Sequence, residues 1–253
     1  ESVKKILEAK FNAGLNKFSP IKTENINEDL NTYVSPLRKQ IAEAAITLLN
    51  DPNLIIDKIK RNATKNTTYI GVGTSSENAF SKSLQDAGIK KIMFAPSTTE
   101  KEAKEFLKKL KSEEAIVLGV HNMTGYPTQN FGLDQNELFL IREIMKTKKA
   151  ITVLFGNPYA VKNFCDNEGV LIAYDEAEET QIAAAKIITG QLKAKGKLPV
   201  TVCTNYKAGD GIVSLTTNLG EVVDSSKFIK QNKDVFNTKL VVEPKSFNTD
   251  LAL

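Results

Sequence analysis

The sequence predicts an α/β domain, a three-layer α/β/α sandwich built around a mainly parallel, doubly wound sheet. From residue 67 onward, short continuous apolar runs alternate with amphipathic segments at helical spacing. Such runs are typical of strands that are buried on both faces, as in a parallel sheet. The alternation of strand and helix predicts βαβ units with right-handed crossovers, which place helices on both faces of the sheet.

The first element is a helix that we expect over residues 2–13. Ser2 stands at a favoured N-cap position, and Gly14 stands where a helix commonly ends in a left-handed residue. An apolar stripe runs along this helix and requires a partner surface, but no domain precedes it in this sequence. The stripe consists of Val3, Ile6, Leu7 and Ala13.

A polar connector, residues 16–34, separates this helix from a second one that we expect over 35–51. Ser35 is its predicted cap and Pro36 its first helical residue. The residues expected to form its buried stripe are Leu37, Ile41, Ala44, Ala45, Leu48 and Leu49.

The alternating region that follows supplies the sheet. We expect strands at 67–73, 90–95, 114–120, 149–156 and 169–175, and helices at 76–87, 99–111, 134–147, 157–165 and 177–192. Residues 197–203 are expected to add an edge strand, where Pro199 is tolerated. The predicted organisation is therefore a helix and linker at 1–34, the sandwich at 35–212, and a surface-wrapping tail at 213–253.

Composition excludes several classes of partner. The 34 basic and 30 acidic residues give a net charge of +4 and are interspersed along the chain. Nucleic-acid binding requires basic residues clustered on one face, so we expect no nucleic-acid partner. The Lys-rich stretch at 101–111 alternates with Glu at helical spacing and is typical of a solvated helix face. No stretch approaches the roughly 18 apolar residues of a membrane helix.

Motifs for cofactors and metals are weak. The loop 71–76, GVGTSS, follows a strand but has Ser76 where the dinucleotide fingerprint requires Gly or Ala, and it lacks the Lys of a P-loop. Cys165 and Cys203 match no metal or redox spacing, and we expect Cys203 to be a buried free thiol. The acidic run 175–179 favours the N-terminus of the helix that follows. We expect no cofactor and no metal.

His121, the only histidine, follows the third predicted sheet strand. Ligands bind at the carboxyl ends of strands in open α/β sheets, so its position is favourable. However, the sequence contains no G-x-S-x-G nucleophile elbow and no further histidine for a zinc site. Both a ligand contact and a hydrogen bond within the loop therefore stay open for His121.

Several stretches together carry a more specific signal. They are the opening SVKKILEAKFNAGL, then 35-SPLRKQIAEAAITLLND-51, 149-KAITVLFGNPYAVKNF-164, 170-VLIAYDEAEETQIAAAKIITGQ-191 and 196-GKLPVTV-202. In this order they resemble the C-terminal domain of glycoside hydrolase family 3, in particular its β-N-acetylglucosaminidase branch. The resemblance implies that the opening helix and linker come from the end of a (β/α)8-like barrel. It also implies that the nucleophilic aspartate and the His–Asp acid–base pair lie in that barrel.

The loop at 119–133, GVHNMTGYPTQNFGL, departs from part of the family pattern. In glucosidase-type members the general acid is a glutamate on the corresponding loop, whereas this loop contains no Asp or Glu. A glycosidase requires two carboxyl or equivalent groups about 5 to 10 Å apart. The departure favours the N-acetylglucosaminidase branch, and we expect no catalytic residue in this chain.

The resemblance thus implies a non-catalytic domain that packs on the barrel and borders the sugar site. The residues expected at this border are His121, Asn122, Tyr126, Asn157 and Tyr159. Asn157 and Pro158 also fit a plain helix cap followed by a first helical residue. Two alternatives stay open, an independent sugar- or peptide-binding module and a spacer to a further C-terminal domain. The sequence leaves the bacterial cell envelope and the cytoplasm equally open as compartments.

Overall fold

The computed structural model describes residues 1–17, 19–20, 22–51, 53–62, 66–96, 99–110, 115–146, 149–166 and 169–212. All of these belong to one unit, Glu1–Ser214. The tail predicted at 213–253 lies outside the described residues.

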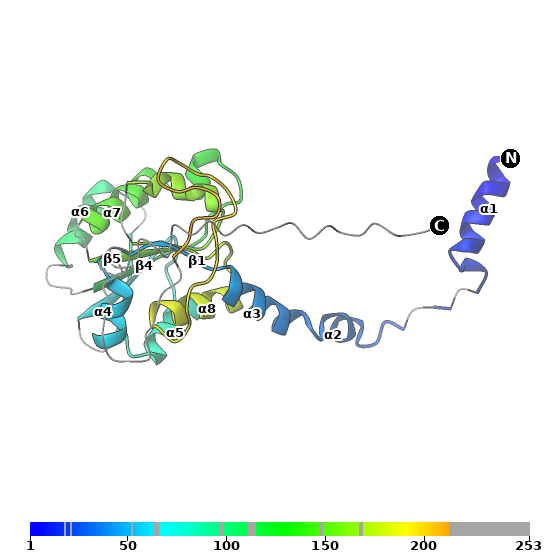
Figure 1. The fold of residues 1–253 in the computed structure, drawn as a ribbon, viewed down its shortest axis with the longest axis horizontal. Coiled ribbons are helices and arrows are strands. Elements are labelled where there is room, and N and C mark those ends of the chain that lie inside the picture. The colour runs from blue at the N-terminus through cyan, green and yellow to red at the C-terminus, as the bar shows by residue number, and fades with distance from the viewer. Residues whose placement is uncertain are drawn as a thin grey trace, which may run out of the picture. The chain divides into compact units, whose positions relative to one another are not determined.

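A six-stranded sheet in the order β1-β6-β5-β4-β2-β3 forms the centre of the domain (Figure 1). Five strands are parallel, and β1 joins β6 antiparallel at one edge. The predicted α/β/α class is therefore confirmed. The strands are β1 (Thr47–Asn50), β2 (Thr67–Val72), β3 (Lys91–Phe94), β4 (Ala115–Val120), β5 (Ala150–Leu154) and β6 (Val170–Ile172).

Helices cover both faces of the sheet (Figure 1). One apolar cluster lies beneath each layer of helices. One layer consists of α3 (Val34–Ala45), α4 (Ile55–Asn62), α5 (Ala79–Asp86) and α8 (Glu178–Ile188). The opposite layer consists of α6 (Glu100–Lys108), α7 (Gln135–Lys146) and the 3-10 helix η3 (Pro158–Phe164). The central strands β2, β4 and β5 are buried along their whole length, which explains their unbroken apolar runs.

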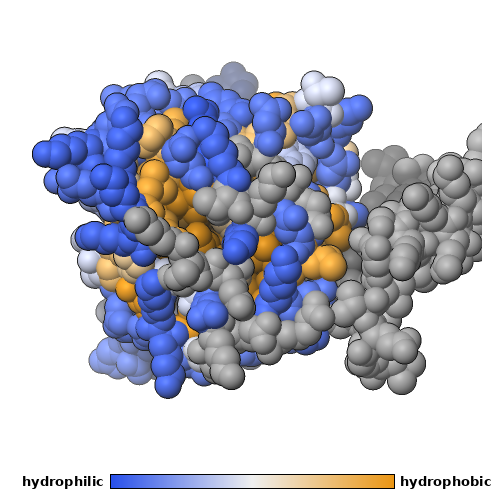
Figure 2. Space-filling view, turned by 90° about the vertical axis from the view of Figure 1, so that its left-hand side faces the viewer, coloured by the Kyte–Doolittle hydropathy of each residue, from blue (hydrophilic) through white to orange (hydrophobic). Residues whose placement is uncertain are grey.

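The predicted charged face of residues 101–111 is confirmed where it is described. In α6, Ala103 and Phe106 are buried, while the Lys and Glu residues around them are exposed. This helix lies at the left of Figure 1, the side that Figure 2 turns toward the viewer. Hydrophilic side chains form most of the described surface there, and apolar side chains show between them (Figure 2).

The single helix predicted over 35–51 is wrong in its second half. The helix α3 ends at Ala45, Ile46 is extended, and β1 follows directly. Leu48 and Leu49 are both buried but lie in different clusters, on opposite faces of the sheet. Adjacent residues point to opposite faces in a strand, whereas in a helix the residues that share a face are three or four positions apart.

The predicted stripe of this helix is also wrong. Leu37 and Ile41 are exposed, whereas Ala42 packs in the core. The helix begins one residue before the predicted cap, and Ser35 instead donates its hydroxyl to Glu179.

No strand forms at 197–203, so the predicted edge strand is wrong. β1 occupies that edge of the sheet instead. Residues on either side of the predicted strand contact the β1 region, where the Gly196 N–H donates to the Ile46 carbonyl and the Ile212 N–H donates to the Leu48 carbonyl. The backbone of Leu198 instead pairs with residues 209 and 210 in a following turn.

The 3-10 helices η1 (Leu15–Lys17) and η2 (Thr128–Gly132) complete the described elements, and three α-helices differ from what the sequence predicts. The helix α4 was not predicted; its first turn is held by Asp51, whose carboxylate accepts the N–H groups of Ile55 and Ile56. The short helix α2 (Ile26–Asn31) lies within the predicted linker. The opening helix is confirmed as α1 (Ser2–Asn12), with Gly14 left-handed after it, but every residue of α1 is exposed and Ser2 is not its cap.

Cys165 and Cys203 form a disulfide, with their Cα atoms 6.5 Å apart. The prediction of a free Cys203 thiol is therefore wrong. Sequence spacing of 38 residues did not indicate the pair, because it is the fold that brings the end of η3 to the loop after Pro199.

We expect loss of this disulfide to lower the free energy of unfolding by about 4 kcal/mol, because a 38-residue separation constrains the unfolded chain. Urea unfolding with and without dithiothreitol measures the difference. The double variant C165S/C203S serves as the control, since it should match the reduced protein and not respond to dithiothreitol. Titration of two free thiols in the unreduced, unfolded chain would contradict the pairing.

Candidate functional site

The candidate site lies where the parallel strands end. The strands β2, β4, β5 and β6 are neighbours and run in the same direction, so the loops after them gather at one edge of the sheet. Ligands bind at this edge in open α/β folds. The segment 121–133 follows β4, residues 155–157 follow β5, and residues 173–177 follow β6.

His121 is the buried centre of this edge, with 2% of its surface exposed. Its Nε2 lies 2.9 Å from the Tyr69 hydroxyl and 3.3 Å from Asn78 Nδ2, and its Nδ1 lies 2.9 Å from Glu176 Oε1. The ring stacks on Phe155 with centroids 4.6 Å apart. Both ring nitrogens are thus engaged inside the protein.

The partners of His121 specify its protonation pattern. Asn78 Oδ1 caps α5 by accepting the Ser81 N–H, so the Asn78 amide nitrogen faces the ring as a donor. Nε2 must then accept, and Nδ1 carries the proton that it donates to the Glu176 carboxylate. The neutral Nδ1–H tautomer fits all three contacts, with the Tyr69 hydroxyl and the Asn78 amide sharing the single lone pair of Nε2.

Tyr69 lies behind the imidazole and is fully buried. Burial raises the pKa of its phenol, and the negative charge of Glu176 raises it further, against a lowering hydrogen bond from Asn78. The phenol therefore stays protonated and donates to His121. Tyr69, His121 and Glu176 thus form a hydrogen-bonded row in which Tyr69 and His121 are buried, and Glu176 is the member that is exposed to solvent.

Glu176 joins two loops. Its Oε1 accepts from His121 Nδ1 and its Oε2 accepts the backbone N–H of Asn122 at 3.0 Å, while 40% of its side chain is exposed. The sequence assigned the acidic run 175–179 to the N-terminus of a helix, and Glu178 and Glu179 do lie in the first turn of α8. Glu176 precedes that turn, and its role was missed. The available signal was that His121 and Glu176 each follow a strand end of one sheet.

Asn157 links the β4 and β5 loops. Its Oδ1 caps η3 by accepting the Tyr159 N–H at 2.9 Å, with Pro158 as the first helical residue. Its Nδ2 donates to the carbonyl of Gly125, also at 2.9 Å. The cap that the sequence offered as the plain interpretation is confirmed, together with a bond between loops that it did not indicate.

Two exposed tyrosines flank this link. Tyr126, next to Gly125, is 75% exposed, and Tyr159, whose N–H Asn157 caps, is 49% exposed. The structure places the five predicted border residues around two hydrogen-bonded groups. His121 and the Asn122 backbone meet at Glu176, whereas Asn157 joins Gly125, the neighbour of Tyr126, to Tyr159. An exposed aromatic ring beside polar groups suits stacking against the apolar face of a sugar ring.

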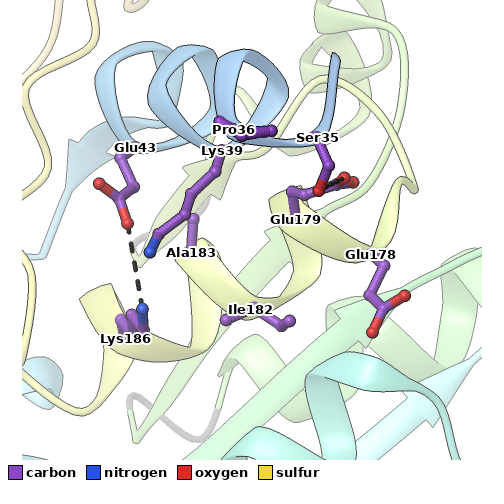
Figure 3. A pocket seen from close by; sticks show the side chains of 9 residues that line it. All are labelled: Ser35, Pro36, Lys39, Glu43, Glu178, Glu179, Ile182, Ala183 and Lys186. Carbon is purple, nitrogen blue, oxygen red and sulfur yellow. Dashed lines mark hydrogen bonds and ion pairs between the residues drawn. The ribbon is translucent and has the colours of Figure 1, made fainter. Parts of the chain in front are cut away.

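A groove of about 500 Å³ lies elsewhere, between α3 and α8 (Figure 3). Charged side chains from both helices line it, and some of them pair across it. Ser35 donates to Glu179 at 3.1 Å, and Lys186 lies 3.9 Å from Glu43 (Figure 3). These contacts join the two helices to each other.

The described residues lack two further features. They contain no group of three or more His, Cys, Asp or Glu side chains placed to hold a metal ion. Among them, no helix has both the length and the apolar character needed to cross a membrane.

The model of the glycosyl hydrolase family 3 C-terminal domain matches residues 16–242. A family 3 β-N-acetylglucosaminidase from Paenibacillus sp. str. FPU-7 is similar in structure, with a TM-score of 0.54 and 17% identity over 79% of this chain and 39% of that chain. A fungal multi-domain family 3 β-N-acetylglucosaminidase has a TM-score of 0.54 and 14% identity, over 87% and 25% of the two chains. A β-glucosidase from Listeria innocua in complex with isofagomine has a TM-score of 0.53 and 14% identity, over 78% and 31%.

At these identities the structural likeness shows the fold. The present chain spans well under half the length of each of these proteins. A comparison with curated protein sequences found no match.

We expect the variant N157A to lower the free energy of unfolding by about 1 to 2 kcal/mol, because it removes the cap of η3 and the bond to Gly125. N157D is the matched variant, since it keeps a cap acceptor and loses the donor to Gly125. It should therefore raise amide hydrogen exchange in the 121–133 loop more than in η3. An N157A protein with the wild-type urea midpoint would contradict this account.

Proposed function

Because this chain belongs to the glycosyl hydrolase family 3 C-terminal domain family, we propose that it serves a β-N-acetylglucosaminidase-like glycosidase as a non-catalytic domain. In this role it packs on a catalytic barrel and borders the sugar site with the loops after β4 and β5. The observation that carries the proposal is the pair of exposed tyrosines, Tyr126 and Tyr159, on segments joined by the Asn157–Gly125 hydrogen bond.

The non-catalytic role is supported by the chemistry of the site. The segment 119–133 has no Asp or Glu, so the loop that carries the general acid in glucosidase-type relatives supplies none here. His121 and Tyr69 are enclosed, and both nitrogens of His121 are occupied. The arrangement suits binding and positioning better than proton transfer to a glycosidic oxygen.

The barrel partner is supported by the opening helix. Its apolar side chains are exposed in the described part of the chain, and such a stripe is stabilised when another surface covers it. The residues concerned are Val3, Ile6, Leu7 and Phe11. Several solved relatives are also much longer than this chain.

The disulfide bears on the compartment. Disulfides persist in oxidising environments and are rare in the cytosol. The Cys165–Cys203 pair therefore supports the cell envelope over the cytoplasm as the place where this protein works.

We expect Y126A and Y159A, each made in the enzyme that carries this domain, to raise KM for an N-acetylglucosaminide about 3- to 10-fold with little change in kcat. Loss of a stacking ring weakens substrate binding, and it leaves the groups that react unchanged. The control Y126F keeps the ring and should behave like the wild type. Unchanged kinetics in both alanine variants would contradict the proposed border.

The Y126A variant also distinguishes the proposed border role from the main alternative, an independent sugar-binding module. Calorimetry of the chain alone with millimolar N-acetylglucosamine should give heat that Y126A abolishes if the module binds on its own. Absence of heat, together with a raised KM in the enzyme, would support the border role.

A further inference from the structure

We propose that Glu176 is the positioning residue of the sugar-facing loop and that its carboxylate fixes the start of the 121–133 segment by holding the His121 ring and the Asn122 backbone together. The part of the inference that concerns sugar binding rests on the proposed function. The clamp itself rests on the geometry of the described residues.

The loop leaves β4 through an unfavourable turn. Asn122 has φ of +54°, in the left-handed region that non-glycine residues seldom adopt, although Asn tolerates it better than most. Its N–H points to Glu176 Oε2 at 3.0 Å. A conformation of this kind persists when its surroundings determine it, and here the carboxylate supplies the bond that does so.

The second oxygen of Glu176 ties the same turn to the core. Oε1 accepts from His121 Nδ1, and the ring is held on its other side by Tyr69 and Asn78. A hydrogen bond to an ionised carboxylate is stronger than one between neutral groups. Adjacent residues of one loop, His121 and Asn122, are therefore attached to one anion.

Glu176 is itself well supported. Its carbonyl accepts from Gln181 Nε2 at 2.8 Å, and Gln181 Oε1 accepts the Phe80 N–H at 3.1 Å. Gln181 is buried within α8. The clamp is thus anchored to α5 and α8, so it can transmit their rigidity to a surface loop.

The restraint continues along the loop toward Tyr126. Thr124 N–H donates to the Phe131 carbonyl at 2.7 Å, which closes the loop on itself. Asn157 then holds the Gly125 carbonyl. Every residue from His121 to Gly125 except Met123 has a fixed hydrogen bond, and Tyr126 follows directly.

A glutamine at position 176 cannot reproduce this arrangement. Its amide has one acceptor oxygen, so either His121 Nδ1–H or the Asn122 N–H would face an NH₂ group. The imidazole could accept from that NH₂ only as the Nε2–H tautomer. That tautomer would set a second donor against the Asn78 amide.

The single histidine allows a direct test. In the chain with ¹⁵N-labelled histidine, two-bond proton–nitrogen correlation spectra should show His121 as the neutral Nδ1–H tautomer. E176Q should abolish that pattern and shift the Asn122 amide signal. E178Q, in the first turn of α8, is the matched control and should change neither signal. An Nε2–H pattern in the wild type, or unchanged His121 signals in E176Q, would overturn the clamp.

Kinetics of the intact enzyme test the consequence for sugar binding. E176Q should raise KM about tenfold with kcat nearly unchanged, as expected when the tyrosine-bearing loop is released. If Y126A raises KM and E176Q does not, the positioning role is overturned while the proposed function stands. If neither changes KM and the tautomer is as expected, the proposed function fails and the clamp stands.

Discussion

The hydrogen bond between the enclosed Nδ1 of His121 and the half-exposed carboxylate of Glu176 joins the loops on which the candidate site depends. It can form because β4 and β6 run in the same direction on either side of β5, so their carboxyl ends meet at one edge. Tyr69, from β2, completes the row behind the imidazole. The parallel sheet thus brings Tyr69, His121 and Glu176, each more than 50 positions from the next in sequence, into one hydrogen-bonded group.

The side of the sheet that ends in strand β1 is built differently from the edge where the parallel strands end. The edge strand β1 pairs antiparallel with β6, the Leu48 carbonyl accepts the Ile212 N–H, and the carbonyl of Ile46, just before the strand, accepts the Gly196 N–H. The segment that follows α8 therefore covers part of this edge. Gly196 approaches so closely that a Cβ there would lie 1.8 Å from the Ala45 carbonyl oxygen. Only glycine fits, which explains why the GKLPVTV stretch begins with it. The disulfide near the end of that stretch attaches it to η3 as well.

The sequence predicted the fold well where one physical signal dominated. Four of the five strands that were found, β2, β4, β5 and β6, are buried along their whole length, and burial on both faces leaves an unbroken apolar run. The cap at Asn157 was found because Asn-Pro is a local signal. Prediction failed where a pattern fitted two structures. Leu48 and Leu49 satisfy a helical stripe and a doubly buried strand equally, and only the pairing with β6 decides between them. The disulfide and the Glu176 contacts depend on strand order, which no local pattern contains.

Both carboxylate oxygens of Glu176 accept hydrogen bonds inside the domain, although 40% of the side chain is exposed. The loop that carries the general acid in glucosidase-type relatives is here free of carboxylates, yet it rests against one from the β6–α8 connection. Each oxygen of that carboxylate accepts one hydrogen bond from inside the domain. A carboxylate offers acceptor sites on both oxygens, so one side chain can hold the imidazole and the Asn122 N–H at the same time. Because His121 is itself held by Tyr69 and Asn78, the turn at Asn122 is tied through this one carboxylate to the buried part of the sheet.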